Sequence, residues 1–191
     1  MSKRLQSLIN RARLILEEPE FVEEYAPAYE IHIFDFDQTL QHKYKPLPCV
    51  EILREHMEAG IPVYIVTARK PDKEQEQHIC DVLYWWDVSF SPENVFAIGD
   101  ELEKGPIVRD LISKHEAERC TFWDDKDYNC ESVFEHCAPM VEELRVYHLS
   151  AAVPGDIRKE IIKDEDNDRK EIKHTLEERK LFRNWRRLSK I

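Results

Sequence analysis

The stretch that decides the fold lies at residues 31–40 and reads Ile31-His32-Ile33-Phe34-Asp35-Phe36-Asp37-Gln38-Thr39-Leu40. Its β-branched and aromatic start predicts a strand that is buried on both faces. Asp35 and Asp37 follow where the strand ends, and each carboxylate raises the pKa of the other unless a cation lies between them. Because α/β sheets bind ligands at the carboxyl ends of their strands, the pair indicates a chemical site. This stretch alone fits equally well a polar turn in which an aspartate caps a helix.

Length and charge limit the class of protein. The 191 residues suffice for one domain with a real core, plus appendages. A formal net charge of -11 argues against a protein that binds nucleic acid through bulk electrostatics. The charge is uneven, because residues 179–191 hold six basic and no acidic side chains, which leaves -17 on residues 1–178.

Cysteine usage and hydropathy indicate a cytoplasmic protein without a membrane partner. The cysteines are odd in number and show no CxxC spacing, which favours reduced thiols over a disulfide or zinc framework. No apolar run reaches transmembrane length, and the first residues lack the apolar core of a signal peptide. The five cysteines are Cys49, Cys80, Cys120, Cys130 and Cys137.

Strands and helices alternate along the chain. This order predicts an α/β fold, a three-layer α/β/α sandwich around a mainly parallel sheet. Residues 41–48 are polar and contain prolines, so we expect a loop there. Strands are expected at 31–34, 61–66, 94–98, 119–123 and about 145–149, and helices at 2–18, 49–59, 72–86, 106–117 and about 130–137.

Polar side chains follow several of these strands. Asp35 and Asp37 end the first, Thr67 the second, and Asp124-Asp125 the fourth, while Lys104 lies in the loop before the helix at 106. In a parallel sheet these ends meet at one edge. Four carboxylates in one cleft repel one another, and hard oxygen ligands without histidine point to Mg²⁺. The sequence therefore predicts a magnesium site at this edge.

These residues resemble the haloacid dehalogenase (HAD) superfamily of phosphotransferases. The four motifs of that family appear in order over residues 31–129: Asp35-Phe36-Asp37-Gln38-Thr39, Thr67, Lys104, and Asp124-Asp125 followed by Asn129. The resemblance implies a Rossmann-like, HAD-like fold and a Mg²⁺-dependent phosphatase. The gaps after the first and second motifs are too short for the cap domain that many members insert. An uncapped site admits a large substrate.

The resemblance also implies roles for these side chains. Asp35 is the expected nucleophile, and Asp37 the general acid and base that also gives its backbone carbonyl to the metal. Thr67 and Lys104 are expected to hold the phosphoryl oxygens. Asp125 is the expected Mg²⁺ carboxylate beside Asp35, with Asp124 as the supporting acid and Asn129 behind them. Taken singly, Thr67 as a strand-end cap, Lys104 as a solvated charge and Asp124-Asp125 as a helix cap remain open.

A closer similarity concerns the substrate. The segments Pro46–Leu53 and Val63–Arg69 look like the phosphatase domain of bacteriophage polynucleotide kinase-phosphatases, which remove 3′-phosphates from nucleic-acid ends, and Asp124-Asp125-Lys126 is similar to RNA-repair-like HAD proteins. This similarity implies that Arg69 contacts the substrate phosphate and that Asp100 orients Lys104. Thr39 and Lys126 are assigned to substrate binding with Arg69. Two residues differ from the pattern of that family. Gln38 occupies a position where glycine is common, and Lys126 occupies a position where the family has arginine. A nucleotide or other small phosphoester is the alternative substrate, and a non-catalytic nucleic-acid-binding protein is the alternative class.

The two ends of the chain are predicted to lie outside the catalytic domain of residues 29–153. Residues 1–28 are expected to form a helix that packs on the core. Residues 154–191 are rich in both signs of charge and are expected to form a charged helical extension. Its basic, aromatic segment 179–188 fits contact with a nucleic-acid strand. It fits slightly better as a cover for its own acidic domain, and a partner subunit is a further alternative.

Overall fold

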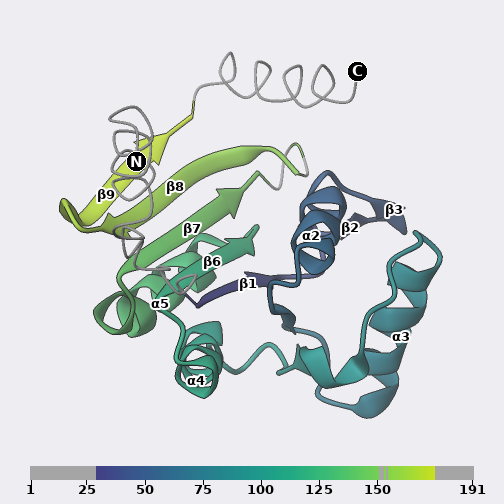
Figure 1. Cartoon of the computed structure of the whole chain (residues 1–191). Coiled ribbons are helices and arrows are strands. Elements are labelled where there is room, and N and C mark those ends of the chain that lie inside the picture. Colours follow the sequence, from purple (N-terminus) through teal and green to yellow (C-terminus); the bar gives the residue numbers. More distant parts are fainter. Residues whose placement is uncertain (1–28, 151–152, 154, 175–191) are drawn as a thin grey trace, which may run out of the picture.

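The computed structural model describes residues 29–150, 153 and 155–174. The predicted helix at 2–18 and the basic segment at 179–188 lie outside these residues. The described chain forms one seven-stranded sheet with helices on both faces (Figure 1). The predicted α/β class with a mainly parallel sheet is therefore confirmed.

The sheet has the order β5-β4-β1-β6-β7-β8-β9. Its first five strands run parallel, and β8 and β9 add an antiparallel hairpin next to β7. Residue 34 pairs with residue 65 on one side and residue 123 on the other, so the ends of β4 and β6 flank the end of β1. The strands are β1 (Glu30–Phe34), β4 (Val63–Thr67), β5 (Val95–Ala97), β6 (Arg119–Asp124), β7 (Glu143–Leu149), β8 (Ile157–Asp164) and β9 (Asn167–Lys173).

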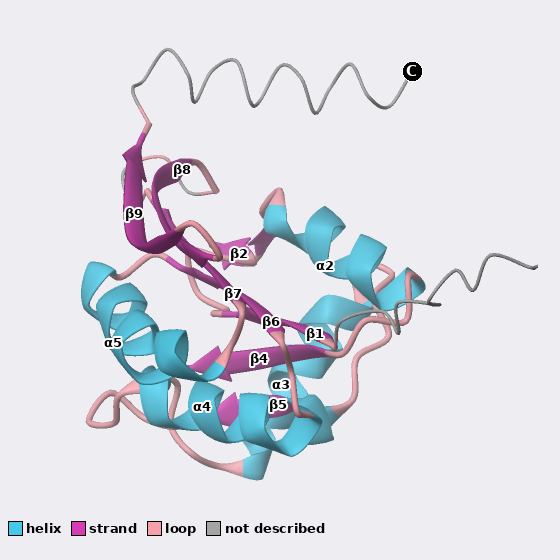
Figure 2. Cartoon of the chain, turned by 60° about the vertical axis from the view of Figure 1, so that its left-hand side comes forward, coloured by secondary structure: helices cyan, strands magenta, loops and turns pink. Residues whose placement is uncertain are grey.

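Two hydrophobic clusters lie on opposite faces of the sheet. Figure 2 shows the helices that cover these two faces. Helices α4 (Lys104–His115) and α5 (Asp127–Cys137) pack on the face that holds Ile31 and Ile33. Helices α2 (Cys49–Glu58) and α3 (Lys73–Tyr84) pack on the face that holds Phe34 and Ile65. Alternate residues of the central strands thus fill both cores, which explains why these strands are almost wholly apolar.

The expected loop at 41–48 contains a small hairpin of β2 (Gln41–His42) and β3 (Lys45–Pro46). Lys43 and Tyr44, at its turn, both have positive φ angles of 50° and 60°. Two left-handed residues in succession are what a two-residue hairpin turn needs, although neither is a glycine. Apart from this hairpin, the connections that the structure describes between the parallel strands consist of one α-helix each, with short turns and 3-10 helices.

The predicted helix is wrong over residues 157–173, which form β8 and β9. Ile161 is buried in the core against β7, and β-branched residues favour this extended position. The turn between the strands is stabilised by Asp164, whose Oδ1 accepts hydrogen bonds from Asp166 N (3.0 Å) and Asn167 Nδ2 (2.7 Å). The charges that suggested a solvated helix instead pair with α5, as described below.

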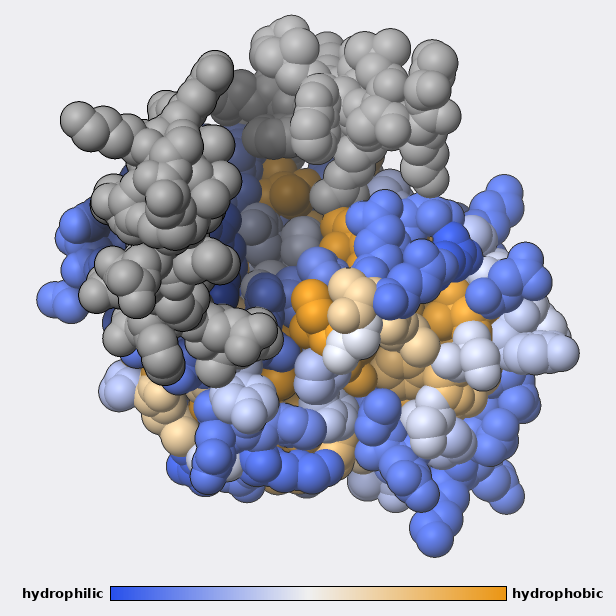
Figure 3. Space-filling model, in the orientation of Figure 1, coloured by the Kyte–Doolittle hydropathy of each residue, from blue (hydrophilic) through white to orange (hydrophobic). Residues whose placement is uncertain are grey.

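The coloured surface in Figure 3 is hydrophilic along most of its outline, in keeping with a chain that is 35% charged. Among the described residues, no helix combines the length and the apolar character needed to cross a bilayer.

Candidate active site

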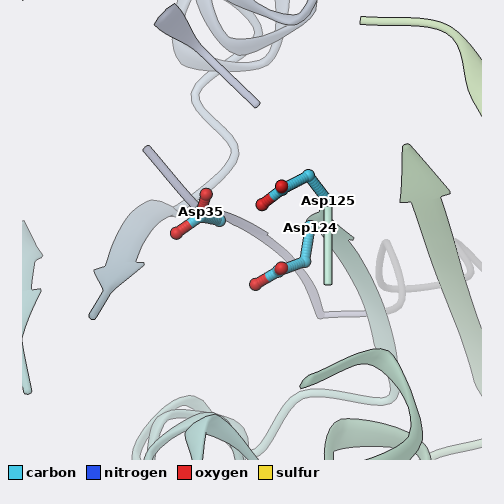
Figure 4. A group of neighbouring side chains, drawn as sticks. All are labelled: Asp35, Asp124 and Asp125. Atoms are coloured by element: carbon cyan, nitrogen blue, oxygen red, sulfur yellow. The ribbon is translucent and has the colours of Figure 1, made fainter. Parts of the chain in front are cut away.

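Three carboxylates meet at the carboxyl edge of the sheet. Asp35 directly follows β1, Asp124 ends β6 and Asp125 follows it, and oxygens of all three lie within 4.8 Å of one another. Figure 4 shows Asp124 and Asp125 reaching from the end of β6 toward Asp35. All three are buried, and Asp125 Oδ2 accepts no hydrogen bond from the residues that the structure describes. A buried carboxylate oxygen without a hydrogen bond, beside two other carboxylates, fits a hard divalent cation such as Mg²⁺.

Lys104 lies among these carboxylates and is 1% exposed. Its Nζ donates to Asp35 Oδ1 (2.5 Å) and to Asp124 Oδ2 (2.7 Å). Burial by itself lowers the pKa of this ammonium, but the two carboxylates outweigh burial and raise the pKa above its ordinary value. Lys104 is therefore a fixed positive charge. It lies in the first turn of α4 and not in a loop before the helix, as the sequence had suggested.

The site also changes the protonation of its carboxylates, Asp35 among them. Burial raises its pKa, the Lys104 charge opposes that rise, and the Asp124 charge adds to it, with a result of about 7. The pKa of Asp125 is also raised, first by burial and then by the charge of Asp35. The described side chains thus leave the cluster short of positive charge, which a bound cation would supply.

Both carboxylate oxygens of Asp124 accept hydrogen bonds. Besides Lys104, it accepts hydrogen bonds from Lys126 N (2.7 Å) and from Asn129 Nδ2 (3.0 Å). Asn129 therefore contacts the cluster through Asp124. With its oxygens occupied in this way, Asp124 fits the supporting acid better than the principal metal ligand.

Asp37 faces Arg69. The guanidinium donates from Nε to Asp37 Oδ2 (2.8 Å) and from Nη2 to Oδ1 (2.9 Å), and it also lies over the Phe36 ring. Partial burial raises the pKa of Asp37, but the hydrogen bonds and charge of Arg69 outweigh it and hold that pKa below its ordinary value. Asp37 is therefore ionised in this arrangement.

Gln41 was missed by the sequence analysis. Its amide contacts Asp37 Oδ1 through Nε2, and its Oε1 accepts from Tyr44 N (2.9 Å). This side chain thus links the tip of the β2–β3 hairpin to Asp37. The sequence offered one sign of this contact, the spacing of four residues between Asp37 and Gln41. The shape of the turn that brings the two side chains together could not be predicted.

The two threonines are buried. Thr67 is the last residue of β4, beside β1 in the sheet, and so lies at the same edge as Asp35. Thr39 is fully buried, and its hydroxyl has no hydrogen-bond partner among the described residues. The structure therefore does not place Thr39 where an arriving substrate could touch it, contrary to the expectation of a substrate contact. Thr39 is buried in the turn after β1, and this burial explains why the expected substrate contact is not available.

Lys126 and Asp100 lie further out. Lys126 has a half-exposed side chain with Nζ 3.4 Å from Asp125 Oδ2, at the rim of the cluster. Asp100 is exposed in the turn before α4 and takes no part in the contacts that the Lys104 ammonium makes. The expected orientation of Lys104 by Asp100 is therefore not seen, because Asp35 and Asp124 already hold the ammonium.

No family model matches the chain, and neither does any curated protein. Solved structures match at low similarity. NagD from Escherichia coli K-12 is 14% identical, with 61% of this chain and 45% of that chain covered, at a TM-score of 0.31. A p-nitrophenyl phosphatase from Archaeoglobus fulgidus is 13% identical (63% and 41% covered, TM-score 0.33), and a hypothetical protein from Pyrococcus horikoshii OT3 is 17% identical (64% and 49%, TM-score 0.32). The chain spans less than half the length of each, and TM-scores this low carry no argument about function.

Proposed function

We propose that this protein is a Mg²⁺-dependent phosphomonoester hydrolase of the haloacid dehalogenase superfamily that works through an aspartyl-phosphate. The observation that carries the proposal is the cluster of Asp35, Asp124 and Asp125 around the buried Lys104 ammonium. Burying three carboxylates with one lysine costs stability unless a cation compensates. Such a cost is characteristic of a functional site.

Asp35, Asp125 and the backbone carbonyl of Asp37 are the groups we assign to Mg²⁺, with Asp124 in support. When bound, Mg²⁺ supplies positive charge that stabilises the phosphoryl group during transfer. Lys104 contributes a second fixed charge on the same side and keeps Asp35 oriented.

An oxygen of Asp35 attacks phosphorus, the bond from phosphorus to the leaving oxygen breaks, and a proton from Asp37 passes to that oxygen. Asp37, now ionised, then takes a proton from water. The resulting hydroxide attacks phosphorus, the bond to Asp35 breaks, and inorganic phosphate is released. Asp37 ends the cycle with the proton that it needs for the next one.

We propose that the protonation of Asp37 depends on whether Arg69 binds Asp37 or the substrate. In the described arrangement its guanidinium keeps Asp37 ionised, which does not suit a general acid. A phosphate dianion competes for a guanidinium through the same bidentate geometry. Once Arg69 turns to the substrate, Asp37 loses the charge that lowers its pKa and can carry a proton to the leaving group.

Asp35→Asn tests the nucleophile with an aryl phosphate such as p-nitrophenyl phosphate and Mg²⁺. Asparagine has the same shape but cannot form the acyl phosphate, so we expect turnover to fall by at least ~10³-fold. Asp110→Asn is the matched control, since it removes an exposed carboxylate of α4 whose ion pair with Arg109 lies outside the site, and it should keep full activity. Equal turnover by Asp35→Asn and the wild type would rule out Asp35 as the nucleophile. A wild type without turnover would leave the non-catalytic alternative.

For the substrate, we propose the 3′-phosphate of a nucleic-acid end. The β2–β3 hairpin next to Asp37 carries Lys43 and Lys45 on either side of Tyr44, which is 71% exposed. Cations and an exposed aromatic ring suit the phosphates and bases of a single strand. Lys126 adds a further cation at the rim of the cluster. A free nucleotide or another small phosphoester is the alternative.

The substrate is tested by comparing a 3′-phosphorylated oligonucleotide with 3′- and 5′-mononucleotides of the same base. We expect kcat/KM to be at least ~10-fold higher for the oligonucleotide, because only it reaches the hairpin. Tyr44→Ala should reduce that preference to a few-fold while leaving turnover of p-nitrophenyl phosphate unchanged. A preference for mononucleotides would contradict the polynucleotide assignment and leave the phosphatase mechanism intact.

A further inference from the structure

The C-terminal hairpin is connected to the acidic cluster by a row of residues across the sheet. Asp124 on β6 lies opposite His148 on β7, and His148 lies opposite Lys159 on β8. Lys159 is thus two strands away from the carboxylates. Its side chain is nevertheless nine-tenths buried, which is unusual for a lysine in an edge hairpin.

Lys159 binds the first turn of α5. Its Nζ lies 2.6 Å from Asp127 Oδ1 and 2.9 Å from Glu131 Oε1, one turn further along the helix. Asp127 is the first residue of α5 and follows Asp125 by two positions. Lys159 therefore holds the first turn of α5 in place. Because this turn begins two residues after Asp125, it also limits where the Asp125 backbone can lie.

His148 completes the connection. Its Nε2 donates to the backbone carbonyl of Asp125 (3.1 Å), and its Nδ1 lies 3.2 Å from the same Asp127 oxygen that Lys159 binds. Among the described residues, Asp125 Oδ2 accepts no hydrogen bond and has only the half-exposed Lys126 ammonium near it, at 3.4 Å. The direction of the Asp125 carboxylate thus depends largely on the backbone that His148 holds.

A second contact reinforces the hairpin against α5. Arg169 on β9 donates from Nη2 to Glu131 Oε2 (2.7 Å), and its guanidinium lies over the Phe134 ring. Two strands of the hairpin thus bind the same helical face. This helps to explain why a segment rich in charge packs as part of the sheet.

We infer that Lys159 is a positioning residue for the metal site, which aims Asp125 through Asp127 and His148. The β8–β9 hairpin is then a part of the active-site framework and not an appendage. This inference rests on the proposed function for the identity of the ion, Mg²⁺. Groups that orient a metal ligand in this way typically change metal affinity by tenfold or more when they are removed.

The experiment measures Mg²⁺ binding to the metal-free full-length chain by calorimetry, together with the Mg²⁺ concentration that half-activates hydrolysis of p-nitrophenyl phosphate. For Lys159→Met we expect the Mg²⁺ dissociation constant and the half-activating concentration to rise about tenfold. Turnover at saturating Mg²⁺ should stay within about twofold, because the groups that react remain in place. Lys159→Arg keeps the charge and should restore most of the affinity.

Lys163→Met is the matched control, since Lys163 lies on the same strand but binds the backbone carbonyls of Val141 and Glu142 at the other end. It should change thermal stability without changing Mg²⁺ affinity. Asp127→Asn provides a second route should Lys159→Met fold poorly, because the Asp127 side chain is 59% exposed. It should weaken Mg²⁺ binding in the same way. Unchanged affinity in the folded variants would overturn the inference alone, whereas a wild type that binds no Mg²⁺ would overturn the proposed function and the inference together.

Discussion

At the scale of single residues, the site is a balance of buried charges. Asp35, Asp124 and Asp125 carry three negative charges, and Lys104 returns one, so the ionised cluster is left at -2. Asp37 is balanced separately by Arg69. One divalent cation would neutralise this remaining charge of -2. Carboxylate oxygens are also the ligands that the proposed Mg²⁺ prefers.

The sequence predicted the members of this cluster better than their contacts. Asp35, Asp124 and Lys104 could be placed together because parallel strands end at one edge, whatever their side chains do. The Arg69–Asp37 pair could not, since it depends on the reach of one guanidinium across neighbouring loops. Thr39 failed for a related reason: its place in the motif gives no sign that the turn buries its hydroxyl.

At the scale of elements, Lys104 is placed by the contact between α4 and α5. The next residue, Gly105, lies so close to α5 that an added Cβ would be 2.5 Å from Ser132 O and 2.6 Å from His136 Nδ1. A backbone oxygen cannot move aside as a flexible side chain can. Glycine at 105 thus lets α4 approach α5 closely enough for the ammonium to reach Asp35 and Asp124.

Gly105→Ala is therefore expected to displace the start of α4 and move Lys104 away from the cluster. We expect a loss of stability of about 1–3 kcal/mol from overpacking and a fall in phosphatase turnover of ~10-fold or more from the misplaced ammonium. Gly60→Ala is the control. Gly60 has φ +74° but open space around it, so alanine there costs about 1–2 kcal/mol of backbone strain without touching the site. Chemical denaturation and steady-state kinetics on both variants separate the effects, and wild-type turnover in Gly105→Ala would contradict this account of Lys104.

The same scale shows where the sequence misled. Residues 157–173 carry charges on most positions and few apolar residues, a pattern that resembles a solvated helix. Their charges are instead satisfied across elements, as Lys159 with Asp127 and Arg169 with Glu131 demonstrate. Partners that lie 28 to 38 residues apart leave no periodic signal. Helix and strand could not be distinguished here without the neighbouring helix α5.

At the scale of the whole molecule, the buried cluster couples protonation to folding. The pKa of Asp35 is about 7 in the folded chain, against an ordinary value of 3.8. Between these two values the folded protein binds a proton that the unfolded chain has released. The contribution of Asp35 to stability is then full below about pH 4 and is lost as the pH rises toward 7. Metal-free protein therefore bears the cost of the charged cluster at neutral and alkaline pH.

This coupling predicts how metal-free Asp35→Asn compares with metal-free wild type in thermal unfolding. Asparagine cannot ionise, so the difference in Tm, variant minus wild type, should be more positive at pH 8 than at pH 5. Each kcal/mol corresponds to roughly 2–4 °C at this chain length, and we expect a change of that order. Mg²⁺ should raise the Tm of the wild type at pH 8 and do so much less for the variant, since the ion binds only the folded chain.

Asp110→Asn serves as the control, because Asp110 is an exposed carboxylate of α4 outside the site. The Tm of this control should follow that of the wild type at both pH values. A Tm difference that is the same at pH 5 and pH 8 would mean that Asp35 is already ionised across this range, and the electrostatic account of the site would then be wrong.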